Sequence, residues 1–198
     1  YYRLYFTITL CNFFLEQTTD DDPETAMQRA EVRYIRAYNY YYIMDLYGNA
    51  AFMTTVSSEL APRYERKQFF EFVESELLEI EPLLANPGQN TYGRADKAAA
   101  WMLLSRLYLN AEVYTGTAQW QNALTYAEKV INNGYYKLNT TGATNPSTGE
   151  KYSAYQMLFL ADNNETSAKY EAILPVLNDG VTTSSYGGMN FLILSTYA

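Results

Sequence analysis

The stretch AAAWMLLSRLYLN (98–110) decides the fold of this 198-residue chain. Its bulky side chains recur at steps of three and four, so Trp101, Leu104 and Tyr108 share one face of a helix. Ser105 lies on the same face and is small enough for a second helix to approach closely. We therefore predict a helix over 96–114, with Asp96 as its N-cap, that packs against a partner.

The partner helix follows directly in the sequence. Residues 118–133 are predicted to be helical and to stop at Gly134. Four positions match the W-x2-L-G-x2-Y opening of a tetratricopeptide repeat, with Ser in place of Gly: Trp101, Leu104, Ser105 and Tyr108. Ala123 and Tyr126-Ala127 supply positions of the second helix. One imperfect repeat is a weak motif, but it predicts stacked helical hairpins.

Three more helices are predicted ahead of this pair. The first covers 1–18, and the second runs from the Asp22 cap and Pro23 to a stop at Gly48. The third spans 66–85. The second helix has the apolar stripe Met27, Ala30, Tyr34, Ala37, Tyr41 and Met44, and the third has Phe69, Val73, Leu77, Ile80 and Leu84. These stripes predict a shared core.

The last third of the sequence has a different texture. Residues 139–151 (NTTGATNPSTGEK) form a polar, Gly-, Ser- and Thr-rich loop, and 171–177 (EAILPVL) is predicted as a strand, which Pro175 restricts to an edge or a bulge. We predict a mainly α protein of tetratricopeptide-repeat-like hairpins. Residues 1–138 would form the helical scaffold, and 139–198 would begin a loop-rich lobe that is incomplete here.

The composition excludes several functions. The chain has no His, which removes His-based triads, His general bases and His metal sites. Its net charge of −8 disfavours nucleic acid as a partner. The chain has no P-loop, dinucleotide fingerprint or nucleophile elbow. Its 21 tyrosines suit wet aromatic binding surfaces.

Cys11 is the lone cysteine, so an internal disulfide is excluded. It does not fit a lipidation site, because Leu10 stands where a lipoprotein signal needs Gly or Ala. We expect a buried thiol on an amphipathic helix. The chain begins at Tyr1, which indicates processing or trimming, and no apolar run is long enough to span a membrane.

Charged and aromatic clusters favour structural roles. The acidic side chains of 71–81 are expected on a solvated helix face, where they lack the raised pKa that a glycosidase acid needs. Arg33, Arg36 and Asp45 predict a polar seam between helices. Trp101 and Trp120 are expected to pack within the repeats, and so is the tyrosine cluster of the second helix: Tyr38, Tyr40, Tyr41, Tyr42 and Tyr47.

Four segments, in order, resemble motifs of the SusD/RagB family. AEVRYIRAYNYYYIMDLYGNAAFMTT (30–55) is similar to the helix with an A-E-x-R-[FY]-x-R-A-[FY] run that ends in D-L-[FY]-G. TYGRADKAAAWMLLSRLYLNAEVY (91–114) and AQWQNALTYAEKVINNGYYKL (118–138) resemble the next helix and hairpin. GVTTSSYGGMNFLI (180–193) is similar to a segment of the starch-binding branch. Members of the family are longer at both ends, so this chain resembles a central part.

The resemblance implies a surface lipoprotein of a Bacteroidetes-type outer membrane, attached through a lipid anchor that this chain lacks. Such a protein binds glycans, does not cleave them, and delivers them to a SusC-like TonB-dependent transporter. A starch-like α-glucan is the expected ligand. The alternative is a tetratricopeptide-type protein-interaction scaffold without glycan binding, and a glycosidase is disfavoured.

The resemblance also implies candidate site residues. Tyr186, between Ser185 and Gly187, is expected to stack on a sugar ring; the alternative is a loop tyrosine packed on the scaffold. Asp162 and Asn164 are candidate calcium ligands, because some family members hold calcium near this loop and calcium prefers hard oxygen ligands. The alternative there is a solvated Asx turn.

Overall fold

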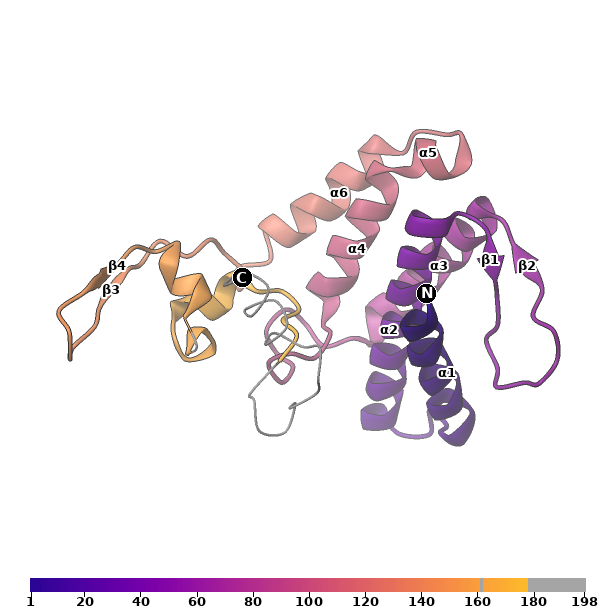
Figure 1. The fold of residues 1–198 in the computed structure, drawn as a ribbon, viewed down its shortest axis with the longest axis horizontal. Coiled ribbons are helices and arrows are strands. Elements are labelled where there is room, and N and C mark those ends of the chain that lie inside the picture. Colours follow the sequence, from indigo (N-terminus) through magenta and orange to yellow (C-terminus); the bar gives the residue numbers. More distant parts are fainter. Residues whose placement is uncertain (161, 178–198) are drawn as a thin grey trace, which may run out of the picture.

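The computed structural model describes residues 1–160 and 162–177, and this part of the chain is mainly helical (Figure 1). The predicted fold class is therefore confirmed. The α-helices are α1 (Tyr2–Gln17), α2 (Pro23–Tyr47), α3 (Arg66–Ile80), α4 (Lys97–Leu109), α5 (Ala111–Thr115) and α6 (Trp120–Ile131). Helix α3 continues into a short 3-10 turn, η1 (Glu81–Leu83).

Helix α2 begins and ends where its sequence signals predict. The Asp22 carboxylate accepts a hydrogen bond from the Thr25 N–H at 2.9 Å, and Pro23 occupies the first turn. At the other end Gly48 adopts φ +76°, a left-handed value that favours glycine, and its N–H donates to the Met44 carbonyl at 3.0 Å. The sequence alone therefore fixes both ends of the longest helix.

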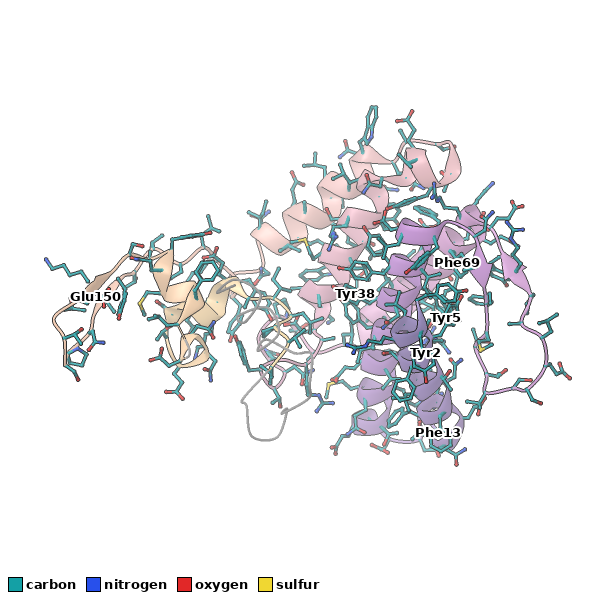
Figure 2. All side chains as sticks on the ribbon, viewed as in Figure 1. Tyr2, Tyr5, Phe13, Tyr38, Phe69 and Glu150 are labelled. Carbon is teal, nitrogen blue, oxygen red and sulfur yellow. The ribbon has the colours of Figure 1, made fainter. Side chains whose placement is uncertain are left out.

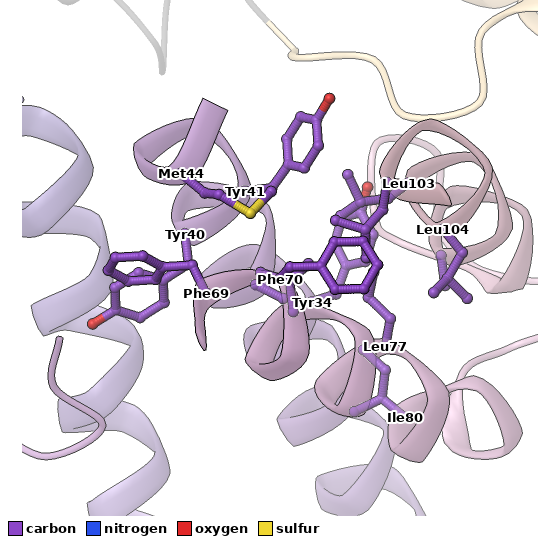
Figure 3. Packing of buried hydrophobic residues seen from close by; sticks show 14 of the residues in the cluster. Tyr34, Tyr40, Tyr41, Met44, Phe69, Phe70, Leu77, Ile80, Leu103 and Leu104 are labelled. Carbon is purple, nitrogen blue, oxygen red and sulfur yellow. The ribbon is translucent and has the colours of Figure 1, made fainter. Parts of the chain in front are cut away.

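The core lies where α2 and α3 pack together, with α1 on the far side of α2 and the α4–α6 hairpin beside them (Figures 1 and 3). The Tyr40 and Phe69 rings stack at a centroid distance of 5.5 Å. Both predicted stripes are buried, apart from Met27, which is half-buried. Cys11 is buried as expected, and burial raises the pKa of its thiol to about 11.

A polar seam crosses this core, as predicted, but its acid is Glu76. Arg36 Nη2 donates to Glu76 Oε2 at 2.8 Å, and Arg33 Nη2 donates to Glu76 Oε1 at 2.7 Å. Burial by itself would raise the pKa of Glu76, but the two guanidinium groups outweigh it and lower that pKa. The expectation that the α3 acids are all solvated is therefore wrong at Glu76.

Asp45 does not join this seam. Its carboxylate accepts a hydrogen bond from the Tyr114 hydroxyl at 2.6 Å. This hydrogen bond links the C-terminal part of α2 to α5.

The α4–α6 hairpin packs as the tetratricopeptide-like spacing predicts. The Ser105 hydroxyl donates to the Ala123 carbonyl at 2.9 Å, and the Tyr108 and Tyr126 rings stack at 5.7 Å. The predicted helix over 96–114 is broken, however, at Asn110, whose φ of −101° and ψ of 10° leave the α region. Asn is unfavourable inside helices because its side chain competes for backbone hydrogen bonds. Helix α5 therefore starts as a separate turn.

Two short antiparallel hairpins complete the described structure. Strand β1 (Ala50–Ala51) pairs with β2 (Arg63–Tyr64), and β3 (Ala143–Thr144) pairs with β4 (Lys151–Tyr152). Glu150, which precedes β4, lies at the opposite end of the molecule from Phe69 (Figure 2). The second hairpin falls in the segment predicted as a polar loop.

The strand predicted at 171–177 is wrong. Residues 167–171 form a 3-10 turn, η4 (Ser167–Glu171), and no strand follows up to residue 177. Pro175 lacks an N–H donor, and the chain instead packs Ile173 and Leu174 against the helical core. Only the middle of the run packs in this way, because Val176 and Leu177 are exposed.

Candidate functional site

The described residues after position 138 form a small lobe of turns, which we call the lobe (139–160 and 162–177). It contains the β3–β4 hairpin, η2 (Gln156–Phe159), η3 (Asn163–Glu165) and η4. The β3–β4 hairpin projects away from α1, α2 and α3 (Figure 1), whereas Ile173 and Leu174 return to the helical core. The only clearly buried apolar side chains of the lobe, among the residues described, are Met157 and Ala168. Polar contacts must therefore hold much of it together.

Asn139 is the centre of these contacts. Its backbone N–H donates to Glu171 Oε2 at 2.7 Å, and its side-chain amide donates to the Ala154 carbonyl at 2.8 Å. Its amide oxygen accepts a hydrogen bond from the Ser167 hydroxyl at 2.8 Å. One side chain therefore ties the start of the lobe to the segments before η2 and within η4.

Asp96 forms a junction between the loop before α4, the start of α4 and Tyr136, whose hydroxyl also lies 3.3 Å from the Ile173 carbonyl of the lobe. It is 1% exposed, and its carboxylate caps α4 by accepting from the Ala98 N–H at 2.9 Å, as predicted. The other oxygen accepts from the Gly88 N–H at 2.9 Å and from the Tyr136 hydroxyl at 2.7 Å. Burial and this bond to Asp96 raise the pKa of Tyr136, so its hydroxyl stays protonated and keeps donating.

A second polar group lies beside this junction. Arg94 Nε donates to the mostly buried Glu31 carboxylate at 2.8 Å, and the Asn90 amide donates to its other oxygen at 2.7 Å. The adjoining cavity, lined in part by Tyr135 and Ile173, measures about 40 Å³. That space suits water and is far below the few hundred Å³ typical of a ligand pocket, so the junction is structural.

The lobe exposes an aromatic pair that the sequence analysis did not single out. Tyr155 and Phe159 are 70% and 71% exposed, with ring centroids 5.1 Å apart. The turn that carries them is fixed, because the Ser153 N–H donates to Gln156 Oε1 at 2.8 Å and Met157 is buried. Exposed, anchored rings can stack on the apolar face of another ring system.

A sequence signal for this pair does exist. The segment YSAYQMLFL (152–160) is aromatic and apolar and contains no charged residue. A short apolar run without helical or strand periodicity does not predict which of its side chains are exposed. Only the folded lobe shows that its aromatic rings point outward.

The candidate calcium ligands lie around η3. Asp162 and Asn164 are both exposed, whereas the intervening Asn163 donates its amide to the Leu158 carbonyl at 2.8 Å. Within 1–160 and 162–177, no three His, Cys, Asp or Glu side chains cluster as a metal site would require. Two oxygen ligands fall short of the six to eight that calcium takes, so these residues alone do not form its site. Tyr186 lies outside the described residues.

The aromatic residues of the helices have mixed outcomes. Trp101 packs as predicted, with its indole N–H donating to Glu81 at 2.7 Å. Trp120 is 63% exposed, so the prediction that it packs within the repeat is wrong for this part of the chain. Of the tyrosine cluster, Tyr40 and Tyr41 are buried, Tyr38 and Tyr42 are half-buried, and Tyr47 is exposed.

The fold is that of a helical-hairpin protein with a loop-rich lobe, and comparison with known proteins shows its family. A SusD-like family model, described as "Starch-binding associating with outer membrane", matches residues 1–109. The chain belongs to this SusD-like family. Across the described segments, no helix has the length and apolar character needed to cross a membrane.

Individual relatives agree with this assignment. The starch-binding protein SusD of Bacteroides thetaiotaomicron is 44% identical over 198 residues, which cover 99% of this chain and 33% of SusD. A SusD superfamily protein from Parabacteroides distasonis is 29% identical with a TM-score of 0.57, over 69% of this chain and 31% of its own. A structure determined with a xylogluco-oligosaccharide has a TM-score of 0.62 at 24% identity, over 70% and 30% of the two chains, and shares the fold. This chain spans about a third of the length of these relatives.

Proposed function

We propose that this chain is part of a protein that binds oligosaccharide or polysaccharide without cleaving it. The observation that carries the proposal is the anchored, exposed pair Tyr155 and Phe159 on an uncharged segment of the lobe. Sugar rings have apolar C–H faces that stack on such side chains, and an uncharged surface suits a neutral glycan. The 44% identity to starch-binding SusD favours a starch-like α-glucan.

Binding without catalysis fits the pKa shift of the buried acid on α3. A glycosidase needs one carboxyl group with a raised pKa as proton donor. Glu76, the buried acid of α3, instead has its pKa lowered by Arg33 and Arg36. It is held as a structural carboxylate and is a poor proton donor.

We include Tyr186 in the proposed glycan site, because a Gly pair follows it in the sequence and glycines have no side chains that could cover its ring. Calcium bound through Asp162 and Asn164 is likewise proposed. Its remaining ligands would come from outside the described residues. A rise in thermal stability with calcium, lost in Asp162→Ala, supports this site, and an equal rise in the variant contradicts it.

The test of glycan binding is gel retardation in a panel of neutral and acidic polysaccharides, with reducing-sugar release assayed in parallel. We expect retardation by a neutral α-glucan, no release, and several-fold weaker retardation for Tyr155→Ala, Phe159→Ala and Tyr186→Ala. Phe6→Ala, which removes an exposed ring from α1, is the matched control and should bind normally. Retardation by no glycan at all favours the protein-interaction scaffold, and release of reducing ends revives the glycosidase.

We further propose that the glycan passes to a SusC-like TonB-dependent transporter at the outer membrane. The family model's association with the outer membrane supports this location. Preferential retention of such a transporter over an unrelated porin by the immobilised chain supports the step. Equal retention of both contradicts it.

A further inference from the structure

The loop between β1 and β2, residues 52–62, lines a second cavity, which we call the loop cavity. Its volume is about 300 Å³, which falls in the range of small-molecule sites. The cavity beside Asp96, by contrast, has room only for water. The β1–β2 loop and the β3–β4 hairpin lie at opposite ends of the long axis of the molecule (Figure 1). The loop cavity is therefore separate from the lobe and its aromatic pair.

Helices α1 and α2 hold the first arm of this loop in place. The Tyr40 hydroxyl of α2 donates to the Met53 carbonyl at 2.6 Å and accepts from the Met53 N–H at 2.9 Å. The fully buried Asn12 of α1 donates its amide to the same carbonyl at 3.2 Å. The Glu16 carboxylate, also on α1, accepts from the Val56 N–H at 2.7 Å. Two helices therefore fix the backbone of this arm.

The second arm is held by the strand pair and by ring stacking. The Phe52 N–H donates to the Pro62 carbonyl at 2.9 Å, which continues the pairing of β1 with β2 into the loop. The Phe52 and Tyr64 rings stack with their centroids 4.0 Å apart and their planes at 11°. A cavity whose walls are already held loses little conformational entropy when a ligand binds. The loop cavity is therefore pre-organised for a ligand.

The side chains that line the loop cavity combine hydroxyl groups, one carboxylate and apolar groups. The polar ones are Thr54, Thr55, Ser57 and Glu59, and Leu60 is the most exposed of the apolar ones. Hydroxyl groups both donate and accept hydrogen bonds, and a carboxylate accepts from two or more donors. This set matches a ligand that carries neighbouring hydroxyl groups on one side and an apolar C–H face on the other.

We propose that the loop cavity is a second sugar-binding site, which takes a neutral sugar unit. Glu59 accepts hydrogen bonds from the sugar hydroxyls, and the C–H face of the ring lies against Leu60. A metal ion does not fit, because Glu59 is the one carboxylate among the described lining residues. The same negative charge disfavours an acidic glycan.

This inference rests on the proposed glycan binding and adds a second point of contact to it. A polysaccharide long enough to reach both the loop cavity and the lobe binds them together and gains avidity, which a short oligosaccharide does not. The two sites can be tested one at a time with a short sugar.

Methyl NMR gives a direct readout, because Thr54, Thr55 and Leu60 line the cavity and carry methyl groups. The probe is maltotriose, a short neutral α-glucan. We expect saturable shifts of these methyl signals in the chain and the same shifts in the double variant Tyr155→Ala/Phe159→Ala, which lacks the aromatic pair of the lobe. Loop shifts that disappear in the double variant would mean that the loop only follows binding at the lobe, and they would overturn the inference.

Substitutions in the loop complete the test. Glu59→Gln and Thr55→Val should weaken the maltotriose-dependent shift of the Leu60 methyls several-fold. Ser58→Ala is the matched control, because Ser58 is exposed on the same loop but is not among the residues that line the cavity. Equal affinity in all three variants overturns the inference.

The remaining outcomes separate this inference from the proposed function. Gel retardation by a glycan with no maltotriose shift in the loop overturns the second site and leaves binding at the lobe intact. No retardation and no shift anywhere contradict both. Loop shifts caused by trilysine and not by maltotriose also overturn the inference, and they would identify a basic protein segment as the occupant.

Discussion

The helical scaffold and the lobe are stabilised by different means. The scaffold buries a continuous apolar cluster that runs from Ile8 on α1 to Ala123 on α6. The described lobe buries Met157 and Ala168 and depends on hydrogen bonds centred on Asn139. Apolar burial contributes about 25 cal/mol per Å², whereas one hydrogen bond contributes about 1 kcal/mol net. The scaffold is therefore stabilised mainly by apolar burial, and the lobe before Ile173 mainly by hydrogen bonds.

The largest effect expected to separate the two regions is alkaline unfolding of the scaffold. Tyr40, on α2, is fully buried against Phe69 of α3. Burial raises the pKa of its hydroxyl to about 12, whereas the pKa of an unfolded tyrosine is about 10. Its folded-state pKa is raised, so its contribution to stability is complete below about pH 10 and is lost as pH rises toward 12. Burial raises the pKa of Tyr34 in the same way.

The measurement is circular dichroism and tyrosinate absorbance followed together as pH rises. Helix content should fall in one transition that coincides with ionisation of the buried tyrosines. A helical signal that stays constant through pH 12 would show that these hydroxyls do not limit stability.

The next largest effect is expected from Glu76→Gln, which leaves Arg33 and Arg36 without their shared carboxylate. Removing one partner of a buried ion pair costs about 3 kcal/mol or more, and the scaffold should lose this stability in urea unfolding. Glu71→Gln is the matched control. Glu71 is exposed and forms a weak surface pair with Lys67, whose Nζ lies 3.9 Å from Glu71 Oε1. Equal midpoints for the two variants would mean that the seam contributes little.

The smallest effect is expected from Asn139→Ala, and it should be confined to the lobe. The substitution removes the amide bonds to Ala154 and Ser167, at a cost of about 2 kcal/mol in local opening. Native-state hydrogen exchange should speed up in 139–177 and stay unchanged in α2 and α3. The exposed Asn132→Ala is the control. Faster exchange throughout the chain would show that lobe and scaffold unfold as one unit.

Local sequence signals were sufficient to predict most of the helices of the scaffold. Asp22, Pro23 and Gly48 predicted the ends of α2, and the spacing of Trp101, Ser105 and Tyr108 predicted the α4–α6 hairpin. The division at residue 138 stays a prediction. The strand predicted at 171–177 is wrong because β-branched and apolar residues favour strands only weakly and by context. Here Ile173 and Leu174 pack against the helical core, and Val176 and Leu177 are exposed.

The candidate site was less predictable. Motif resemblance selected Tyr186, Asp162 and Asn164, and none of their proposed roles depends on a periodic pattern. The outward rings of Tyr155 and Phe159 depend on how η2 sits in the lobe, which the neutral run 152–160 does not specify. Side-chain exposure is a property of the whole packed chain.

The sequence by itself determined the helices, their caps, their buried stripes and the family, because these depend on residues a few positions apart. Only the tertiary structure decided which charges and rings meet. Glu76 pairs with Arg33 and Arg36 across 40 or more residues, and Asp96 joins Gly88 to Tyr136. Such pairings depend on how the helices pack. The packing brings the guanidinium groups that keep Glu76 charged, and it decides which aromatic rings remain exposed.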